Sequence, residues 1–107
     1  MSSRIHLPEH LAFIRTLPCL VCLNDISSEA AHIRYSSAKF CKVNPGQRKP
    51  HDFWTIPLCG YDHRKQHGQN EEWYWRGIGI DPLPIALALY ANSGNYLECE
   101  KIIRAQH

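Results

Sequence analysis

A thiol, a carboxylate and two imidazoles fall within nine residues of one stretch, Pro57-Leu58-Cys59-Gly60-Tyr61-Asp62-His63-Arg64-Lys65-Gln66-His67. Side chains of these types bind metal ions in proteins. The stretch begins with apolar residues, and the segment from Asp62 to Gln66 lacks glycine, proline and β-branched side chains, so a strand end that turns into a helix is predicted. His63 and His67, four residues apart, would share one face of that helix, where a single ion can touch both.

A second half of a metal site lies upstream, where Cys19-Leu20-Val21-Cys22 forms a C-x-x-C pair. Tetrahedral zinc sites are commonly assembled from such a pair and a distant second half. Cys59 and Asp62 repeat the spacing of this pair, with a carboxylate in place of the last thiol. The sequence therefore predicts a structural zinc site whose ligands are Cys19, Cys22 and Cys59, with either Asp62 or His63 as the fourth.

The length of 107 residues suits one domain, residues 1–107, and a structural metal commonly stabilises chains of this size. The cysteine count of five is odd, which argues against a framework built only of disulfides. No window approaches the roughly 18 apolar residues of a membrane span, and the N-terminal residues contain no signal-peptide core. We therefore expect a soluble, cytoplasmic protein with no membrane partner.

The net charge is only +2, but the charges are unevenly distributed. The segment from Ala30 to His51 contains five basic residues and no acidic one. A basic segment between the two halves of a metal site indicates a polyanion as partner, although a charge run taken alone usually marks a solvated loop. The basic residues are Arg34, Lys39, Lys42, Arg48 and Lys49.

Two segments rich in β-branched and aromatic side chains, residues 29–35 and 53–58, predict a β-hairpin. His32 lies in the first strand, and a histidine between two apolar neighbours is, on its own, more often structural than catalytic. Asp52, just before the second strand, suits a turn or cap residue or a metal ligand.

Helices are predicted on both sides of this hairpin. The first is amphipathic and ends at Pro18, and the later ones begin at the N-cap residues Asp81 and Asn95. The metal-binding core would occupy about residues 17–70, and residues 71–107 would form a helical scaffold with both tryptophans near its start in the core. The expected helices cover residues 7–17, 71–76, 83–91 and 95–106.

The order of these motifs resembles the HNH endonucleases, also called ββα-metal or His-Me finger nucleases. Within that family it is most similar to the phage and prophage proteins related to a phage recombination-enhancing nuclease, over roughly residues 6 to 90. The segments that carry the resemblance are the C-x-x-C pair, Ala31-His32-Ile33-Arg34, Lys49-Pro50-His51-Asp52, Trp54-Thr55-Ile56-Pro57-Leu58-Cys59 with His63 and His67, and Gly79-Ile80-Asp81-Pro82.

The resemblance implies an α+β fold: a small zinc-stapled ββα-metal core with an N-terminal helix and C-terminal flanking helices. The implied activity is hydrolysis of phosphodiester bonds in DNA with a catalytic Mg²⁺, Mn²⁺ or Zn²⁺ ion, beside phage recombination or other DNA-processing proteins. His32 matches the general base, and Asp52 matches a position that binds metal or orients His32. His63 and His67 match the ligands of the catalytic ion, and the five basic residues would hold the DNA phosphate backbone.

The chain departs from the family pattern at three positions. A metal ligand often stands where Ala31 is found, cysteine or histidine where Asp62 is found, and an acidic residue where His51 is found. Two other functions therefore remain under consideration. One is a non-catalytic zinc-finger-like module that binds nucleic acid or protein, and the other, with less support, is a thiol oxidoreductase that uses the C-x-x-C pair.

Overall fold

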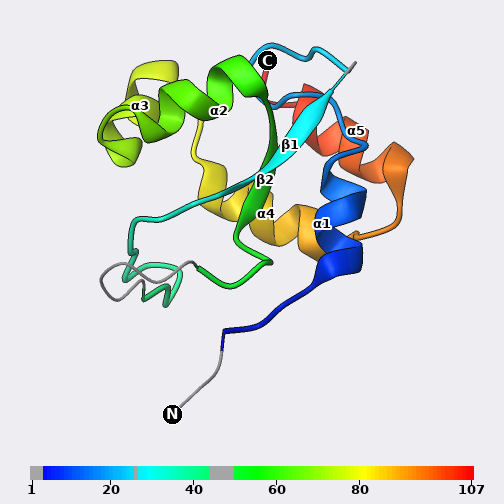
Figure 1. Ribbon diagram of the computed structural model, residues 1–107, viewed down its shortest axis with the longest axis horizontal. Helices are drawn as coiled ribbons and strands as arrows, with labels where there is room; N and C mark the ends of the chain where they lie inside the picture. Colours follow the sequence, from blue (N-terminus) through cyan, green and yellow to red (C-terminus); the bar gives the residue numbers. More distant parts are fainter. Residues whose placement is uncertain (1–3, 26, 44–49) are drawn as a thin grey trace.

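The computed structural model describes residues 4–25, 27–43 and 50–107. The described chain has the small α+β fold that the sequence predicts, with a two-stranded antiparallel sheet and five helices (Figure 1). No described helix is long and apolar enough to cross a membrane. The elements are α1 (Pro8–Ile14), β1 (Ser28–His32), β2 (Thr55–Cys59), α2 (Gly60–His67), α3 (Glu71–Ile78), α4 (Pro82–Ala91) and α5 (Tyr96–Arg104).

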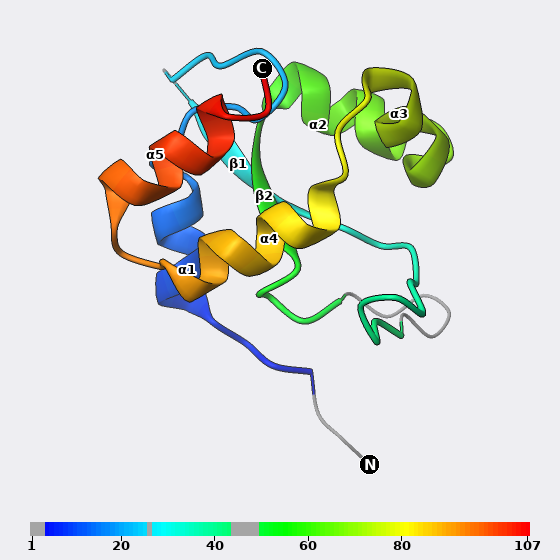
Figure 2. The ribbon, with the colours of Figure 1, turned by 180° about the vertical axis from the view of Figure 1, so that it is seen from behind.

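The predicted hairpin is present, with Ser28 opposite Cys59 and His32 opposite Thr55. The bounds differ from the predicted ranges 29–35 and 53–58: the first strand runs from Ser28 to His32, and the second runs from Thr55 to Cys59. The first four residues of β2 are buried, since α1, α2 and α4 all pack against this strand. Figure 2 shows α4 lying across β2, with α5 beside α4.

Side-chain caps define the starts of the last three helices. Asp81 accepts a hydrogen bond from the Leu83 backbone N–H and Asn95 accepts one from Glu98, as the sequence predicts. Asn70 caps α3 in the same way. These caps satisfy backbone donors that the first turn of a helix leaves without partners.

The core forms where α1, the hairpin and α3 to α5 meet. The prediction that both tryptophans of α3 lie in this core is half wrong, because Trp75 is 1% exposed but Trp73 is 70% exposed. Only one face of α3 packs inward, and that face carries Tyr74 and Trp75. The largest fully buried apolar side chains are Trp75, Ile14, Leu17, Leu20, Ile33, Ile56, Leu58, Leu89 and Ile103.

We expect Leu89→Ala to lower the free energy of unfolding by about 2–5 kcal/mol, because Leu89 is fully buried and its removal leaves a cavity between α4 and its neighbours. Leu97→Ala is the matched control: this leucine is 70% exposed, so the change should stay within about 0.5 kcal/mol. Urea denaturation of the two variants measures both values. Equal losses would show that α4 does not cover the core as described.

Candidate functional site

Three cysteines and one aspartate meet where β2 joins α2. We call Cys19, Cys22, Cys59 and Asp62 the cysteine–aspartate cluster; their ligand atoms all lie within 4.8 Å of one another. Cys59 ends β2 and is the N-cap residue of α2, and Asp62 lies in the first turn of that helix. Strand, cap and first helical turn thus present two of the four ligands from one short segment.

The other two ligands come from a loop that is attached to the free edge of β2. The Leu20 N–H donates to the Pro57 carbonyl oxygen at 2.9 Å, which places the loop beside the strand. The loop closes on itself, because Cys19 N–H donates to Asn24 O and Leu23 N–H donates to Cys19 O, both at 2.9 Å. Leu23 has φ 62°, in the left-handed region, and this turn folds the loop so that both thiols lie near Cys59.

Three distances within the cluster are close to those around a tetrahedrally coordinated zinc ion. The Cys22 and Cys59 sulfurs are 3.8 Å apart, and Asp62 Oδ2 lies 3.1 Å from Cys59 Sγ and 3.4 Å from Cys19 Sγ. Ligands around a tetrahedral zinc are separated by about 3.8 Å for two sulfurs and about 3.5 Å for sulfur and oxygen. Asp62 is 6% exposed and pairs with no basic side chain in the described part of the chain. A cation would supply the positive charge that this buried carboxylate lacks.

Burial raises the pKa of all three thiols. Hydrogen bonds from the backbone N–H groups of Cys22, Cys59 and Val21 partly offset this rise at Cys19. A raised pKa is the opposite of what activates a redox thiol, and all five cysteines are free. Metal binding requires the thiolates, so loading the cluster would release protons.

The question of the fourth ligand is answered by the direction in which His63 points. Its Nε2 lies 2.9 Å from Nε2 of His67, whereas Asp62 contacts the thiols. His63 and His67, which we call the histidine pair, therefore lie apart from the cysteine–aspartate cluster, on a different face of α2. The spacing predicted their shared face, and the structure places both rings there with centroids 4.6 Å apart.

Each ring of the histidine pair is also held by a carboxylate. Glu29 Oε1 lies 2.7 Å from His63 Nδ1, and Glu71 Oε1 lies 2.9 Å from His67 Nδ1. A carboxylate only accepts hydrogen bonds, so both Nδ1 atoms are donors, and in the neutral rings both Nε2 atoms carry lone pairs. Two lone pairs at 2.9 Å repel unless a proton or a metal ion lies between them. Carboxylate, histidine and metal in line form a common arrangement at metal sites.

The protonation state of His67 is consistent with metal binding. Burial lowers the pKa of His67, the hydrogen bond that its Nδ1–H donates to Glu71 opposes this, and the charge of Arg34 lowers the pKa further. The net effect favours the neutral imidazole, which is the form that binds metal ions.

His32 and Asp52 form a third feature beside the hairpin. Asp52 Oδ1 lies 2.9 Å from His32 Nε2 and 2.6 Å from an Arg4 nitrogen, while Oδ2 accepts from the Leu7 N–H at 2.8 Å. Burial raises the pKa of Asp52, but the hydrogen bonds from His32 and Leu7 and the charge of Arg4 outweigh it, so the pKa lies below its ordinary value. Both oxygens of Asp52 are thus engaged by hydrogen bonds, and one of these bonds is to His32.

The basic residues of the predicted polyanion surface differ in their surroundings. Lys42 is 3% exposed and its ammonium donates to the Tyr35 carbonyl oxygen at 2.6 Å, so it is not available to a phosphate. Desolvation lowers the pKa of Lys42 to about 8, which the sequence did not predict. Arg34 and Lys39 are exposed. Arg48 and Lys49 lie outside the described residues.

Sequence reasoning missed three residues that organise the site: Glu29, Glu71 and Arg4. Glu71 follows His67 by four residues, which is a detectable signal, but the glycine at 68 suggests a helix end between them. Glu71 also accepts from the Arg34 backbone N–H at 2.9 Å and so connects α2, α3 and the exit of β1. Glu29 and Arg4 reach their partners across distances in sequence that no local pattern reveals.

The described residues thus define a small α+β protein with a Cys₃Asp cluster that could hold a metal ion. A family model described as "Protein of unknown function (DUF968)" matches residues 2–80, and the chain belongs to that family. Neither the curated proteins nor the solved structures contain a match to the chain.

We expect the purified protein to contain one tightly bound zinc ion per chain, and Cys22→Ser to lose that ion and melt at a lower temperature, because zinc binding and folding are coupled. Cys41→Ser is the matched control, since Cys41 is exposed and outside the cluster. Elemental analysis and thermal melts with and without a chelator measure both effects. Unchanged zinc content and melting in Cys22→Ser would contradict a structural metal at the cluster.

Proposed function

We propose that this protein is a metal-dependent DNA endonuclease of the HNH type, with zinc in the cysteine–aspartate cluster and a catalytic divalent cation at the histidine pair. The observation that supports this most directly is the geometry of the pair, in which two Nε2 atoms converge at 2.9 Å while carboxylates hold both Nδ1 atoms. A cation about 2.1 Å from each nitrogen would separate the two by about 3.0–3.4 Å, close to this distance.

A divalent ion at this position would supply positive charge beside the scissile phosphate and stabilise the charge that develops on its oxygens. His63 and His67 would hold it, and Glu29 and Glu71 would fix the orientation of the two rings. The family resemblance assigns the same two histidines to the catalytic ion. Geometry and resemblance therefore support the same residues independently.

His32 is the proposed general base. Asp52 keeps a proton on Nε2, the tautomer in which Nδ1 is the basic nitrogen. In the proposed reaction His32 takes a proton from the water whose oxygen forms a bond to phosphorus. The phosphorus–oxygen bond to the leaving sugar oxygen then breaks, and that oxygen takes up a proton from solvent.

The DNA backbone would lie against the exposed basic side chains on the loop that follows β1. Arg34 and Lys39 are the described members of this group. Contacts of this kind bind phosphates without reading the bases. We therefore expect binding that weakens strongly with salt.

Two observations favour a second candidate, the non-catalytic zinc-finger-like binding module. Ala31 is fully buried against the core and Asp52 is engaged elsewhere, so the histidine pair would provide the only two protein ligands among the residues that resemble the family's site. Such a module would bind DNA or protein through the same surface and would not need His32.

For the nuclease, we expect the zinc-loaded protein to nick plasmid or single-stranded DNA when Mg²⁺, Mn²⁺ or Zn²⁺ is added. His32→Ala should reduce the rate by about 10²–10⁴-fold, the usual contribution of a general base, with zinc content and melting temperature retained. Leu97→Ala is the control, because Leu97 is 70% exposed on α5 and belongs to neither the cysteine–aspartate cluster nor the histidine pair. Absence of cleavage by the wild type, with DNA binding retained, would favour the binding module instead.

Glu71→Gln tests the histidine pair separately. Loss of the charge that orients His67 should weaken Mn²⁺ affinity and cleavage by about 10–100-fold, because Glu71 is one of the two carboxylates on the pair. Glu9→Gln, in the first turn of α1, is the control. Calorimetric titration of Mn²⁺ into zinc-loaded protein gives the affinity, and an unchanged value would remove Glu71 from the site.

A further inference from the structure

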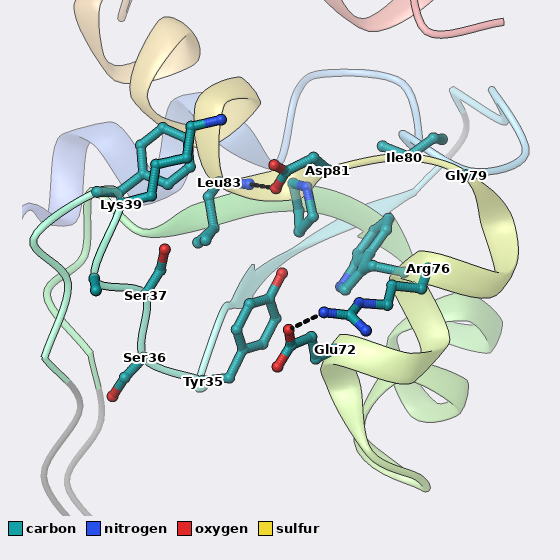
Figure 3. A pocket seen from close by; sticks show the side chains of 14 residues that line it. Tyr35, Ser36, Ser37, Lys39, Glu72, Arg76, Gly79, Ile80, Asp81 and Leu83 are labelled. Atoms are coloured by element: carbon teal, nitrogen blue, oxygen red, sulfur yellow. Dashed lines mark hydrogen bonds and ion pairs between the residues drawn. The ribbon is translucent and has the colours of Figure 1, made fainter.

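A cavity of about 580 Å³ opens between the loop that follows β1 and the junction of α3 with α4 (Figure 3). Its volume is in the range of small-molecule sites. The loop contributes Tyr35, Lys39 and Phe40, and the helical side contributes Glu72, Arg76 and Asp81. None of these six residues belongs to the cysteine–aspartate cluster or the histidine pair.

The cavity combines aromatic surface with carboxylates. Tyr35 and Phe40 line it, and aromatic rings of this kind stack on nucleobases. In Figure 3 the Tyr35 hydroxyl points into the middle of the cavity, with Asp81 on one side of it and the paired Glu72 and Arg76 on the other. Glutamate and aspartate accept hydrogen bonds from the exocyclic amino groups of bases.

The charges around Tyr35 also favour hydrogen bonding between the cavity and a base. Burial raises its pKa, and the neighbouring carboxylates of Asp81, Glu72 and Glu71 raise it further. The hydroxyl therefore stays protonated and can donate to a ligand, while the carboxylates around it accept. Lys39 and Arg76 lie on opposite sides of the cavity (Figure 3), where a nucleotide's phosphate on either side would meet a positive charge.

A residue of the cavity, Tyr35, is also near the proposed base, His32, in the sequence. Tyr35 follows His32 by three residues, which an extended backbone spans in roughly 10 Å. A stacked strand rises about 3.4 Å per nucleotide, so this distance corresponds to a few nucleotides. On the other side, Glu71 contacts His67 and the next residue, Glu72, lines the cavity. Two adjacent residues of α3 therefore connect the histidine pair with the cavity.

We propose that this cavity binds an unpaired DNA base that carries an exocyclic amino group, a few nucleotides from the bond that is cut. The inference rests on the proposed nuclease and deepens it: the substrate would be single-stranded or locally unpaired DNA. A base inside an intact duplex is stacked and paired, and it cannot enter such a site without being flipped out.

The test is a titration of zinc-loaded, ¹⁵N-labelled protein with dCMP, dAMP and dTMP, followed by NMR chemical shifts. We expect shifts at Tyr35 and Glu72 and at least tenfold weaker binding of dTMP, which lacks the amino group. Glu72→Gln should remove this preference, and Tyr35→Ala should weaken all three nucleotides. Tyr61→Ala is the control, because Tyr61 is exposed on α2 and does not line the cavity.

The result that overturns the inference is the absence of shifts at the cavity, or equal binding of dCMP and dTMP by the wild type. The His32→Ala protein separates this failure from failure of the nuclease, because it should bind the nucleotides as the wild type does. Cleavage that depends on His32 without nucleotide binding would remove the cavity from the substrate site and leave the nuclease standing. Nucleotide binding without cleavage would remove the nuclease instead.

Discussion

The arrangement of both clusters depends on the direct junction of β2 with α2 at Cys59. No loop separates the two elements, so the strand fixes where the helix begins and in which direction it runs. Each residue of a helix is rotated by about 100° from the one before, and the adjacent residues Asp62 and His63 therefore face different partners. Asp62 meets the thiols, and His63 meets His67 and a carboxylate of β1. An eight-residue helix thereby presents two clusters of different chemistry.

The features that local patterns specify were predicted well. The hairpin, the helix with paired histidines and the caps at Asp81 and Asn95 all follow from side-chain type and spacing, and the structure contains them. The choice between Asp62 and His63 could not be made in advance, because it depends on how α2 is rotated about its axis against the hairpin. That rotation is set by packing of the whole core, which no short segment encodes.

The residues that were missed, or that the structure places differently, share a physical cause. Glu29, Arg4 and Lys42 act through contacts with segments distant in sequence, or through burial that their charge would not suggest. Lys42 is the clearest case: a lysine in a basic run usually faces water, but here its ammonium lies over the Trp54 ring and donates to one carbonyl oxygen. Composition predicted the sign of the charge on this loop correctly and could not predict which charges reach the surface.

The position of α4 has a consequence for the order in which the chain can fold during synthesis. Residues 2–80 match the family and include every member of the cysteine–aspartate cluster and the histidine pair, but α4 begins at Pro82 and packs across β2. A nascent chain that has emerged only to residue 80 therefore carries every residue of the cysteine–aspartate cluster and the histidine pair while one face of its hairpin is not yet covered by α4. In such a chain the side chains that could bind metal are complete before the helix that covers β2 has been made.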